Sequence, residues 1–264
     1  MAPSLAILMY HDIVETLEQG RDPAYDVLLR DFEEQMAYLD GAGFKVLSLR
    51  ELAERRCTDP APDRAVIVTF DDGRVSNFER ALPALRRHGF PAEFFLTVGR
   101  IGKPGFVGWG QAAELMEAGM GVGSHAVRHV YLDDLPSQDA RAELEDSKAE
   151  LERRLGAPVG FFAPPGGRIT PELTAFARRI GYRGICTSRV GVNRFGGDLF
   201  RLRRIAVVRD MSLERFKSIV HRRPGVIGRY RAAAGLRNAA KKLLGNRRYD
   251  WLREKILTRR HADL

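Results

Sequence analysis

The sequence predicts an α/β barrel followed by a basic helical tail. Short apolar runs alternate with amphipathic stretches some seven or eight times within about 220 residues, which is typical of strands and helices that build a mostly parallel sheet. That many units favour a closed barrel over a doubly wound sheet. The chain has 264 residues, of which 44% are hydrophobic, enough to bury a core of this size.

The predicted strands are short apolar runs, and most of them precede an amphipathic stretch. They cover residues 5–10, 45–49, 64–70, 93–98, 121–124, 160–163, 184–187 and 202–208. The predicted helices cover residues 29–42, 77–88, 109–118, 137–155, 171–180 and 213–220. In the first helix, Phe32, Met36 and Leu39 share one face, and Gly43 ends the helix.

The positive charge is concentrated at the C-terminal end. The whole chain has 43 Lys and Arg against 34 Asp and Glu, a formal net charge of +9. Residues 221–264 hold 13 of the basic and 3 of the acidic residues, which leaves 30 basic and 31 acidic residues in the rest. We therefore predict a near-neutral domain over residues 1–220 and a basic tail over residues 221–264.

Residues 226–260 have the pattern of two amphipathic helices separated at Gly245 and Asn246. Such helices can lie on an anionic membrane, where each nearby Lys or Arg contributes about 1 kcal/mol. They can equally pack their apolar side on the domain and leave the basic face in solvent. Nucleic-acid binding is the weakest interpretation, because no recognition motif accompanies the charge.

Cysteine content and the N-terminal residues bear on the compartment. The two cysteines, Cys57 and Cys186, exclude a disulfide-rich scaffold and suit a reducing compartment. No run approaches the roughly 20 apolar residues that span a bilayer. The first ten residues lack the basic start of a signal peptide, so we interpret them as a buried strand. We expect a cytoplasmic protein, and the tail adds peripheral contact with the inner membrane as an alternative.

Polar or Gly/Pro-rich residues follow four of the predicted strands. In parallel α/β folds, the chemistry collects at these carboxyl ends. The four segments are Tyr10-His11-Asp12, Asp71-Asp72-Gly73, residues 125–129 and Ala163-Pro164-Pro165-Gly166-Gly167.

The adjacent carboxylates Asp71 and Asp72 can divide two roles between them. Because the chain turns at a strand end, both side chains can reach one cavity, where one binds a metal and the other stays free as a base. Asp-Asp-Gly is also an ordinary turn sequence, so this pair does not decide the function by itself.

His125 and His129 have the i, i+4 spacing. On one helical turn this spacing puts both imidazoles on the same face, as a metal site requires. The alternative is two unrelated surface histidines. Because the whole chain contains only six histidines, two of them four residues apart directly after an apolar strand favour a shared role. Two histidines and a carboxylate form a common facial set for a catalytic divalent metal.

Together these motifs resemble those of the polysaccharide deacetylase family, the family 4 carbohydrate esterases built on the NodB homology domain. The resemblance rests on Thr69-Phe70-Asp71-Asp72-Gly73, on His125-x-x-x-His129 and on the Pro-rich turn, and it covers roughly residues 5–220. It implies a distorted (β/α) barrel of about seven strands.

The resemblance also implies a role for each site residue. Asp71 would be the catalytic base, while Asp72, His125 and His129 would bind a divalent metal. Zinc is the first expectation, and cobalt, nickel and manganese suit the same ligands. The turn that contains Pro165 and Gly166 would supply a backbone N–H to the oxyanion.

Two departures from the family pattern point to one of its branches. Many members carry an Arg in the Pro-rich turn, where this chain has Ala163, with Arg168 nearby. Many also carry a late Leu-x-x-His motif, but residues 201–210 contain no histidine. Enzymes that de-N-acetylate poly-β-1,6-N-acetylglucosamine instead have an N-terminal Met-Tyr-His-x-Ile string. Residues 9–13 match it, so His11 becomes the candidate general acid, against the alternative of a satisfied core histidine.

The expected function is therefore the metal-dependent removal of N-acetyl groups from N-acetylhexosamine residues of a polysaccharide or a glycan intermediate. A deformylase or deacetylase of a lipid- or nucleotide-linked amino sugar is a close variant. A glycan-binding module that kept the barrel but lost turnover is the alternative from another class, and the missing Arg and late His favour it.

Overall fold

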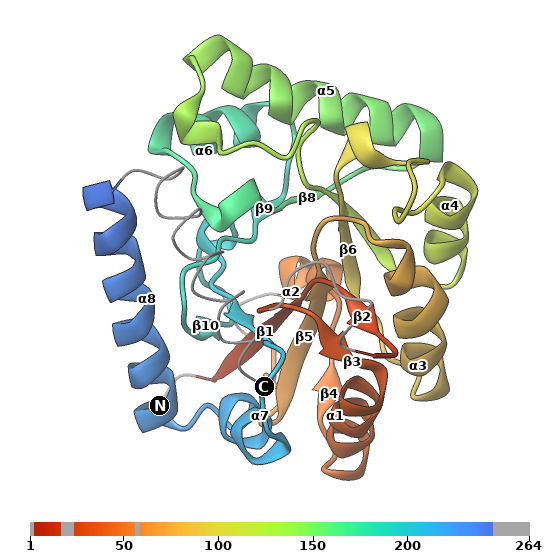
Figure 1. The fold of residues 1–264 in the computed structure, drawn as a ribbon, viewed down its shortest axis with the longest axis vertical. Coiled ribbons are helices and arrows are strands. Elements are labelled where there is room, and N and C mark those ends of the chain that lie inside the picture. Colours follow the sequence, from red (N-terminus) through yellow and green to blue (C-terminus); the bar gives the residue numbers. More distant parts are fainter. Residues whose placement is uncertain (1–2, 17–23, 56–58, 245–264) are drawn as a thin grey trace.

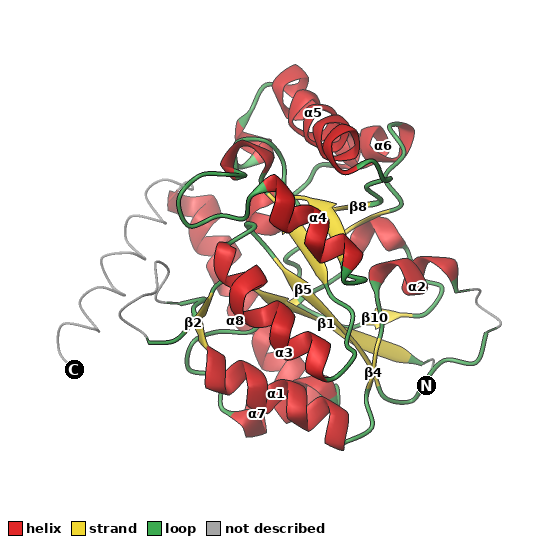
Figure 2. Ribbon diagram, turned by 90° about the vertical axis from the view of Figure 1, so that its right-hand side faces the viewer, coloured by secondary structure: helices red, strands yellow, loops and turns green. Residues whose placement is uncertain are grey.

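The computed structural model describes residues 3–16, 24–55 and 59–244, with side chains to residue 236. A curled sheet lies at the centre and helices surround it (Figures 1 and 2). Neighbouring strands along its main path are parallel. In spatial order they are β1 (Ser4–Tyr10), β5 (Ala65–Phe70), β6 (Glu93–Leu96), β7 (Gly121–Ser124), β8 (Phe161–Phe162) and β9 (Gly184–Ile185).

The remaining strands are two residues long and lie beside this path. β10 (Asn193–Arg194) pairs antiparallel with β1, and β4 (Lys45–Val46) pairs with β5. β2 (Ile13–Val14) and β3 (Val27–Leu28) form a separate pair.

One short segment closes the curl of the sheet. Leu202 pairs in parallel with Cys186, just past β9, and β11 (Ile205–Ala206) pairs in parallel with β1. Residues 202–206 therefore bridge the last strand and the first, which confirms the predicted distorted (β/α) barrel. Arg204 lies between the two pairings and is only 1% exposed.

The interior of the barrel is packed with side chains from alternate strand positions, including Leu5, Ile67, Phe95 and Leu202. β7 contributes glycines, whose missing side chains leave room for neighbouring ones. A Cβ atom on Gly123 would lie 2.5 Å from the Phe95 ring, and one on Gly121 would lie 2.0 Å from Glu93 Oε2. The glycines of β7 thus make room for Phe95 and for the buried Glu93.

A second, larger apolar cluster packs the helices against the outside of the barrel. The helices are α1 (Leu29–Gly41), α2 (Leu49–Glu54), α3 (Leu82–Arg87), α4 (Trp109–Glu117), α5 (Ser137–Leu155), α6 (Pro171–Arg179), α7 (Leu213–Val220) and α8 (Pro224–Leu244), with a π-helical turn, η2 (Asn77–Ala81), before α3. As predicted, Phe32, Met36 and Leu39 of α1 are fully buried, and Gly43 follows the helix in the left-handed conformation at φ +68°.

The structure corrects the predicted strand 45–49. Regular pairing ends at Val46, and α2 begins at Leu49 behind a capping box. The Glu51 N–H donates to Ser48 Oγ at 3.0 Å, and the Ser48 N–H donates to Glu51 Oε2 at 2.7 Å. These bonds satisfy amide groups that a helix start leaves free, so they outweigh the apolar run.

The described part of the tail is one helix, α8, which runs along one side of the molecule (Figure 1). Its first turns pack on the domain, because Ile227 is 5% exposed and belongs to the outer apolar cluster. Leu236, further along, is 74% exposed. No described helix is long and apolar enough to cross a membrane. The second predicted tail helix and Cys57 lie outside the described residues.

Candidate active site and metal centre

The sequence-predicted site residues lie at one edge of the barrel. His11 follows β1, Asp71 and Asp72 follow β5, and His125 follows β7. Parallel strands place their carboxyl ends at the same edge, so these side chains converge. The ends of β1 and β5 are hydrogen-bonded there, because the Asp71 N–H donates to the Tyr10 carbonyl oxygen at 3.0 Å.

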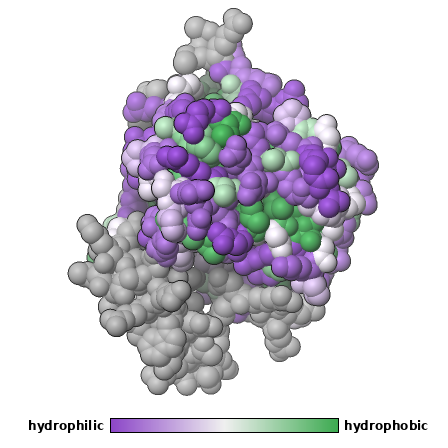
Figure 3. Space-filling view, turned by 90° about the horizontal axis from the view of Figure 1, so that it is seen from above, coloured by the Kyte–Doolittle hydropathy of each residue, from purple (hydrophilic) through white to green (hydrophobic). Residues whose placement is uncertain are grey.

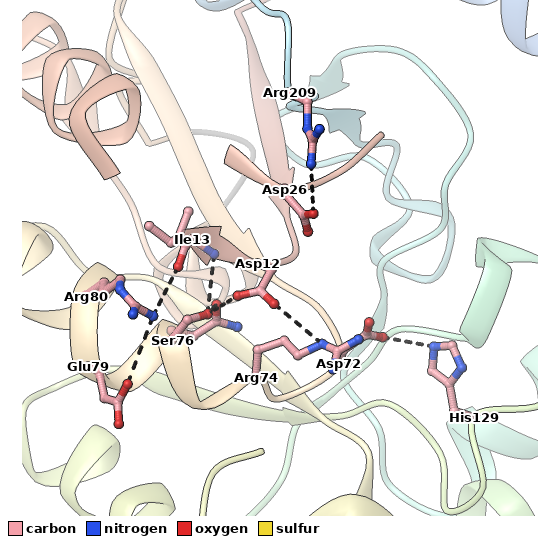
Figure 4. A network of polar contacts seen from close by, with 11 residues as sticks. Asp12, Ile13, Asp26, Asp72, Arg74, Ser76, Glu79, Arg80, His129 and Arg209 are labelled. Atoms are coloured by element: carbon pink, nitrogen blue, oxygen red, sulfur yellow. Dashed lines mark hydrogen bonds and ion pairs between the residues drawn. The ribbon is translucent and has the colours of Figure 1, made fainter. Parts of the chain in front are cut away.

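Asp72, His125 and His129 form a group in which the potential ligand atoms all lie within 4.8 Å of one another. Asp72 Oδ1 lies 2.9 Å from His129 Nε2 and 3.4 Å from His125 Nε2. Figure 4 shows the Asp72 carboxylate directed at the His129 ring. The three side chains predicted from the motifs are therefore together in space.

The prediction that His125 and His129 lie on one helical turn is wrong. Residues 125–131 form a loop, in which Ala126 and His129 take left-handed conformations at φ +63° and +57°. Asp72 is also left-handed, at φ +76°. Such conformations cost roughly 1–3 kcal/mol for residues other than glycine, and they concentrate at functional sites. The loop brings the two imidazoles together by backbone geometry that no helical spacing predicts.

The hydrogen bonding and the electrostatic surroundings of these three residues fit a divalent cation. His125 Nδ1 lies 2.6 Å from the Ala163 carbonyl oxygen and must donate to it, so Nε2 of the neutral ring carries a lone pair. Burial lowers the pKa of His129, which favours its neutral form. Burial alone would raise the pKa of Asp72, whereas protonated imidazoles beside it hold that pKa well below the usual range. A metal cation at the same place keeps Asp72 ionised while both rings stay neutral.

The surroundings of Asp72 Oδ1 test whether these three residues suit a bound cation. The atom is buried and makes no hydrogen bond within the described residues, although two imidazole nitrogens face it. A buried acceptor without a donor is costly. Lone pairs that converge on one point are stabilised by a cation there, so the donor set suits a metal held by one carboxylate and two imidazoles.

Asp71 is held by an ion pair buried in the barrel. Arg204 Nη1 donates to Oδ1 at 2.6 Å and Nη2 donates to Oδ2 at 2.8 Å, and the side chains are 0% and 4% exposed. Burial alone would raise the pKa of Asp71, but the Arg204 guanidinium, with smaller contributions from His125 and His11, holds it below the usual range. Asp71 is therefore an ionised carboxylate with a fixed orientation beside the candidate metal site.

Arg204 was missed in the sequence, where Arg168 is the arginine nearest to the family's position. In the structure Arg168 instead lies 2.9 Å from Asp133 and stacks on the Tyr131 ring. The signal for Arg204 was its place in the predicted strand 202–208, where it shares a face with Leu202 and so points inward. Its pairing with a residue 133 positions earlier could not be read from the sequence.

His11 lies beside both carboxylates. It directly follows Tyr10, whose carbonyl oxygen accepts from the Asp71 N–H, so it lies next to the Asp71–Asp72 turn at the same edge of the barrel. The ring packs on Tyr25 with centroids 4.6 Å apart, and its buried Nδ1 atom makes no hydrogen bond within the described residues. Among the described residues, no hydrogen-bond partner satisfies the Nδ1 atom of His11.

A polar network holds the chain next to His11 against the loop that follows Asp72 (Figure 4). Ser76 Oγ donates to Asp12 Oδ1 and accepts from the Ile13 N–H at 3.3 Å. Arg74 Nε lies 4.0 Å from Asp12 Oδ2, and Arg80 Nη1 donates to the Ile13 carbonyl oxygen at 3.4 Å. These contacts fix the position of His11 relative to the Asp71–Asp72 turn.

The Pro-rich turn after β8 is next to the metal group, because the Ala163 carbonyl oxygen binds His125. Pro165 has no N–H, and the Gly167 N–H donates to the Pro164 carbonyl oxygen at 2.7 Å. Within the turn that sequence analysis selected, the Gly166 N–H is thus the remaining candidate donor. Gly166 is left-handed at φ +68°, and a Cβ there would lie 2.2 Å from the Tyr131 ring.

The fold and the site define a class of protein: a distorted (β/α) barrel with a candidate Asp-His-His metal centre and a buried, ionised carboxylate at the carboxyl ends of its strands. A family model described as polysaccharide deacetylase matches residues 58–185. Over these residues, just under half of the chain, it matches the polysaccharide deacetylase family. The Asp72–His125–His129 group fits the metal dependence of its deacetylases.

Individual relatives agree with this assignment. The Bacillus subtilis (strain 168) protein YxkH, named for this family, is 28% identical over 217 residues, which are 82% of this chain and 76% of that protein. A poly-beta-1,6-N-acetyl-D-glucosamine N-deacetylase of Staphylococcus aureus is 32% identical over 82 residues, 31% of this chain and 28% of that protein.

Solved structures show the same fold. The Streptococcus pyogenes deacetylase PplD in complex with acetate has a TM-score of 0.75 at 24% identity, covering 84% of this chain and 99% of that one. IcaB from Ammonifex degensii has a TM-score of 0.72 at 26% identity, covering 83% of this chain and 97% of that one.

The buried ion pair gives a stability prediction. Arg204→Gln leaves Asp71 buried without its partner, so the free energy of unfolding at pH 7 should fall by about 3–5 kcal/mol. Because the folded pKa of Asp71 is lowered, its contribution is present above the usual carboxyl pKa of about 4 and is lost as the pH falls through the folded pKa. Urea unfolding at pH 7 and pH 3 should show the difference from wild type shrinking at the lower pH.

Arg203→Gln is the matched control, because Arg203 is the exposed neighbour of Arg204. Its effect should stay within about 0.5 kcal/mol. Equal losses in the two variants would contradict a special role for the Arg204 pair.

Proposed function

We propose that this protein is a metal-dependent hydrolase that removes N-acetyl groups from N-acetylhexosamine residues of a glycan. The observation that carries the proposal is the ionised Asp71, fixed by Arg204, beside an Asp-His-His group suited to a divalent cation. The family match supports the reaction class, and the named activity of the Staphylococcus aureus relative supports the N-acetylated substrate.

In the proposed mechanism each residue has one task. A divalent metal bound by Asp72, His125 and His129 would act as a Lewis acid toward the acetamide carbonyl and lower the pKa of water. Asp71 accepts a proton from the attacking water, a task that its low pKa allows at neutral pH. The Gly166 N–H donates to the oxyanion, within a turn that Pro165 shapes. His11 donates a proton to the departing nitrogen, which gives acetate and a free amine.

Zinc is our proposal for the metal, since two imidazoles and one carboxylate leave open positions typical of catalytic zinc. Asp72→Ala should lose bound zinc and activity together. Asp71→Asn should keep zinc and lose turnover, because Asp71 is assigned to proton transfer. Elemental analysis after dialysis, paired with acetate release from N-acetylglucosamine oligomers, measures both. A zinc-loaded Asp71→Asn protein with near-normal turnover would contradict the assignment of the base.

The role of His11 predicts a dependence on the leaving group. An amine leaves only when protonated, whereas the phenolate of an aryl acetate leaves without a proton. His11→Gln should therefore slow acetate release from N-acetylglucosamine oligomers about 10²–10⁴-fold. The same variant should hydrolyse an aryl acetate at nearly the wild-type rate, with unchanged metal content. Equal slowing of both substrates would show that His11 is not the acid.

The same measurements separate the proposal from a glycan-binding module without turnover. The absence of the family's Arg from the Pro-rich turn favoured that alternative, but Arg204 reaches the base from the closing strand. A metal-loaded protein that binds the oligomers and releases no acetate would support the silent module. Release of formate from N-formyl sugars, at a higher rate than acetate, would instead support the deformylase variant.

We also propose a division of labour along the chain, with residues 1–220 as the catalytic domain and residues 221–264 as a tail that contacts an anionic membrane. The location would then be cytoplasmic, at the surface of the inner membrane. The support is the basic charge of the tail and α8, which turns Ile227 toward the domain and exposes Arg229 and Leu236.

Truncation tests the membrane proposal. Removing residues 237–264 leaves Ile227 in place and takes away 9 of the tail's basic residues. Co-sedimentation with vesicles of phosphatidylglycerol and phosphatidylcholine should be lost, and wild-type binding should weaken with added salt. Pure phosphatidylcholine vesicles are the control. Unchanged binding by the truncated protein would remove the tail as a membrane contact.

A further inference from the structure

A cavity of about 730 Å³ lies between the Pro-rich turn, α6, the residues after β9 and the 3₁₀ turn η6 (Leu199–Arg201). Its volume is within the range of ligand pockets, roughly 300–1,000 Å³. Its apolar surface includes Ile169, Ala175 and Phe200. Of the residues that line the cavity, the proposed mechanism uses Gly166 alone.

The charged lining of the cavity has one sign. It contains four arginines and no acidic residue: Arg168, Arg178, Arg189 and Arg201. Asp133 and Asp198 pair with the first two of these from outside the lining. Arg189 and Arg201 are exposed and form no ion pair with any residue that the structure describes. The cavity is therefore lined by two guanidinium groups without an ion-pair partner among the described residues, together with apolar side chains.

The other two arginines are held in place. Arg178 lies over the Phe200 ring with its Cζ atom 3.7 Å from the ring centroid. Arg168 lies over the Tyr131 ring at 4.9 Å, and its buried Nε makes no hydrogen bond within the described residues. Stacked guanidinium groups lose little freedom when they bind a planar or tetrahedral oxyanion, which they can hold through two parallel N–H groups.

The cavity adjoins the candidate active site through the Pro-rich turn, which borders both. Gly166, the candidate oxyanion donor, lines the cavity, and its turn binds His125 through the Ala163 carbonyl oxygen. Tyr131 links the two regions, because it lies two residues after His129, packs on Gly166 and carries Arg168 on its ring. The cavity therefore borders the turn that would face the acetamide of a sugar held at the metal group.

We propose that this cavity is a second substrate subsite, which binds an oxyanion carried next to the N-acetylated sugar. The inference rests on the proposed function and narrows its substrate to anionic glycans. A uronic acid carboxylate and a sugar phosphate present the same chemistry to Arg189 and Arg201, so the experiment separates these two sources.

Isothermal titration with the full chain tests the proposal. The acidic probes are a tetrasaccharide of alternating N-acetylglucosamine and glucuronic acid, and N-acetylglucosamine 1-phosphate. The neutral probe is tetra-N-acetylchitotetraose. Arg189→Ala combined with Arg201→Ala should weaken binding of at least one acidic probe by about tenfold or more, since charge-assisted hydrogen bonds are lost. Binding of the neutral probe should not change.

Arg179→Ala combined with Arg194→Ala is the matched control, because it removes two exposed arginines outside the cavity. This control should bind all three probes as wild type does. The probe that the cavity variant loses identifies the carboxylate or the phosphate as the source. Equal binding of neutral and acidic probes by wild type, or equal effects of the two double variants, would overturn the proposal.

The catalytic proposal is measured separately, by acetate release from each of the three probes, all of which carry an N-acetyl group. A protein that releases acetate but shows no arginine-dependent preference retains the proposed function and loses the anionic subsite. A protein with that preference but without acetate release retains the subsite and loses the catalytic assignment.

Discussion

The buried ion pair between Arg204 and Asp71 is the interaction on which the site depends. Removing two charges from water costs several kcal/mol each, which two short, parallel hydrogen bonds offset only when the geometry is good. Such a pair adds little net stability compared with an apolar core of the same volume. Its value here is that it fixes the orientation and the charge of one carboxylate at the edge of the barrel.

This pair also connects the topology to the chemistry. Arg204 is available because residues 202–206 bridge β9 and β1, and that bridge closes the barrel. Closure of the barrel therefore completes the sheet and places the Arg204 guanidinium beside Asp71. On the other side of the same turn, Asp72 is left-handed and faces two imidazoles, so adjacent carboxylates have opposite surroundings. Asp71 is ionised and paired with the Arg204 guanidinium, whereas Asp72 is available to bind a metal cation.

The sequence predicted the barrel, most helices and the converging carboxylates and histidines, because these follow from periodicity and from motifs at strand ends. It did not predict what depends on distant pairing. Arg204 meets Asp71 only after the closing strand has found its register, and the 125–131 loop is shaped by left-handed residues that no spacing rule includes. Pro165 was selected with its turn, although a proline supplies no N–H, and the capping box at Ser48 outweighed an apolar run.

The pH dependence of kcat/KM for acetate release tests two roles together: Asp71 as the base and Arg204 as the group that keeps it ionised. The acid limb of this profile reports a free-enzyme group that must be deprotonated. The zinc-loaded Arg204→Gln protein should show its acid limb moved to higher pH than wild type, because burial raises the pKa of Asp71 and the largest opposing contribution, that of Arg204, is gone. An acid limb at the same pH in both proteins would contradict the account.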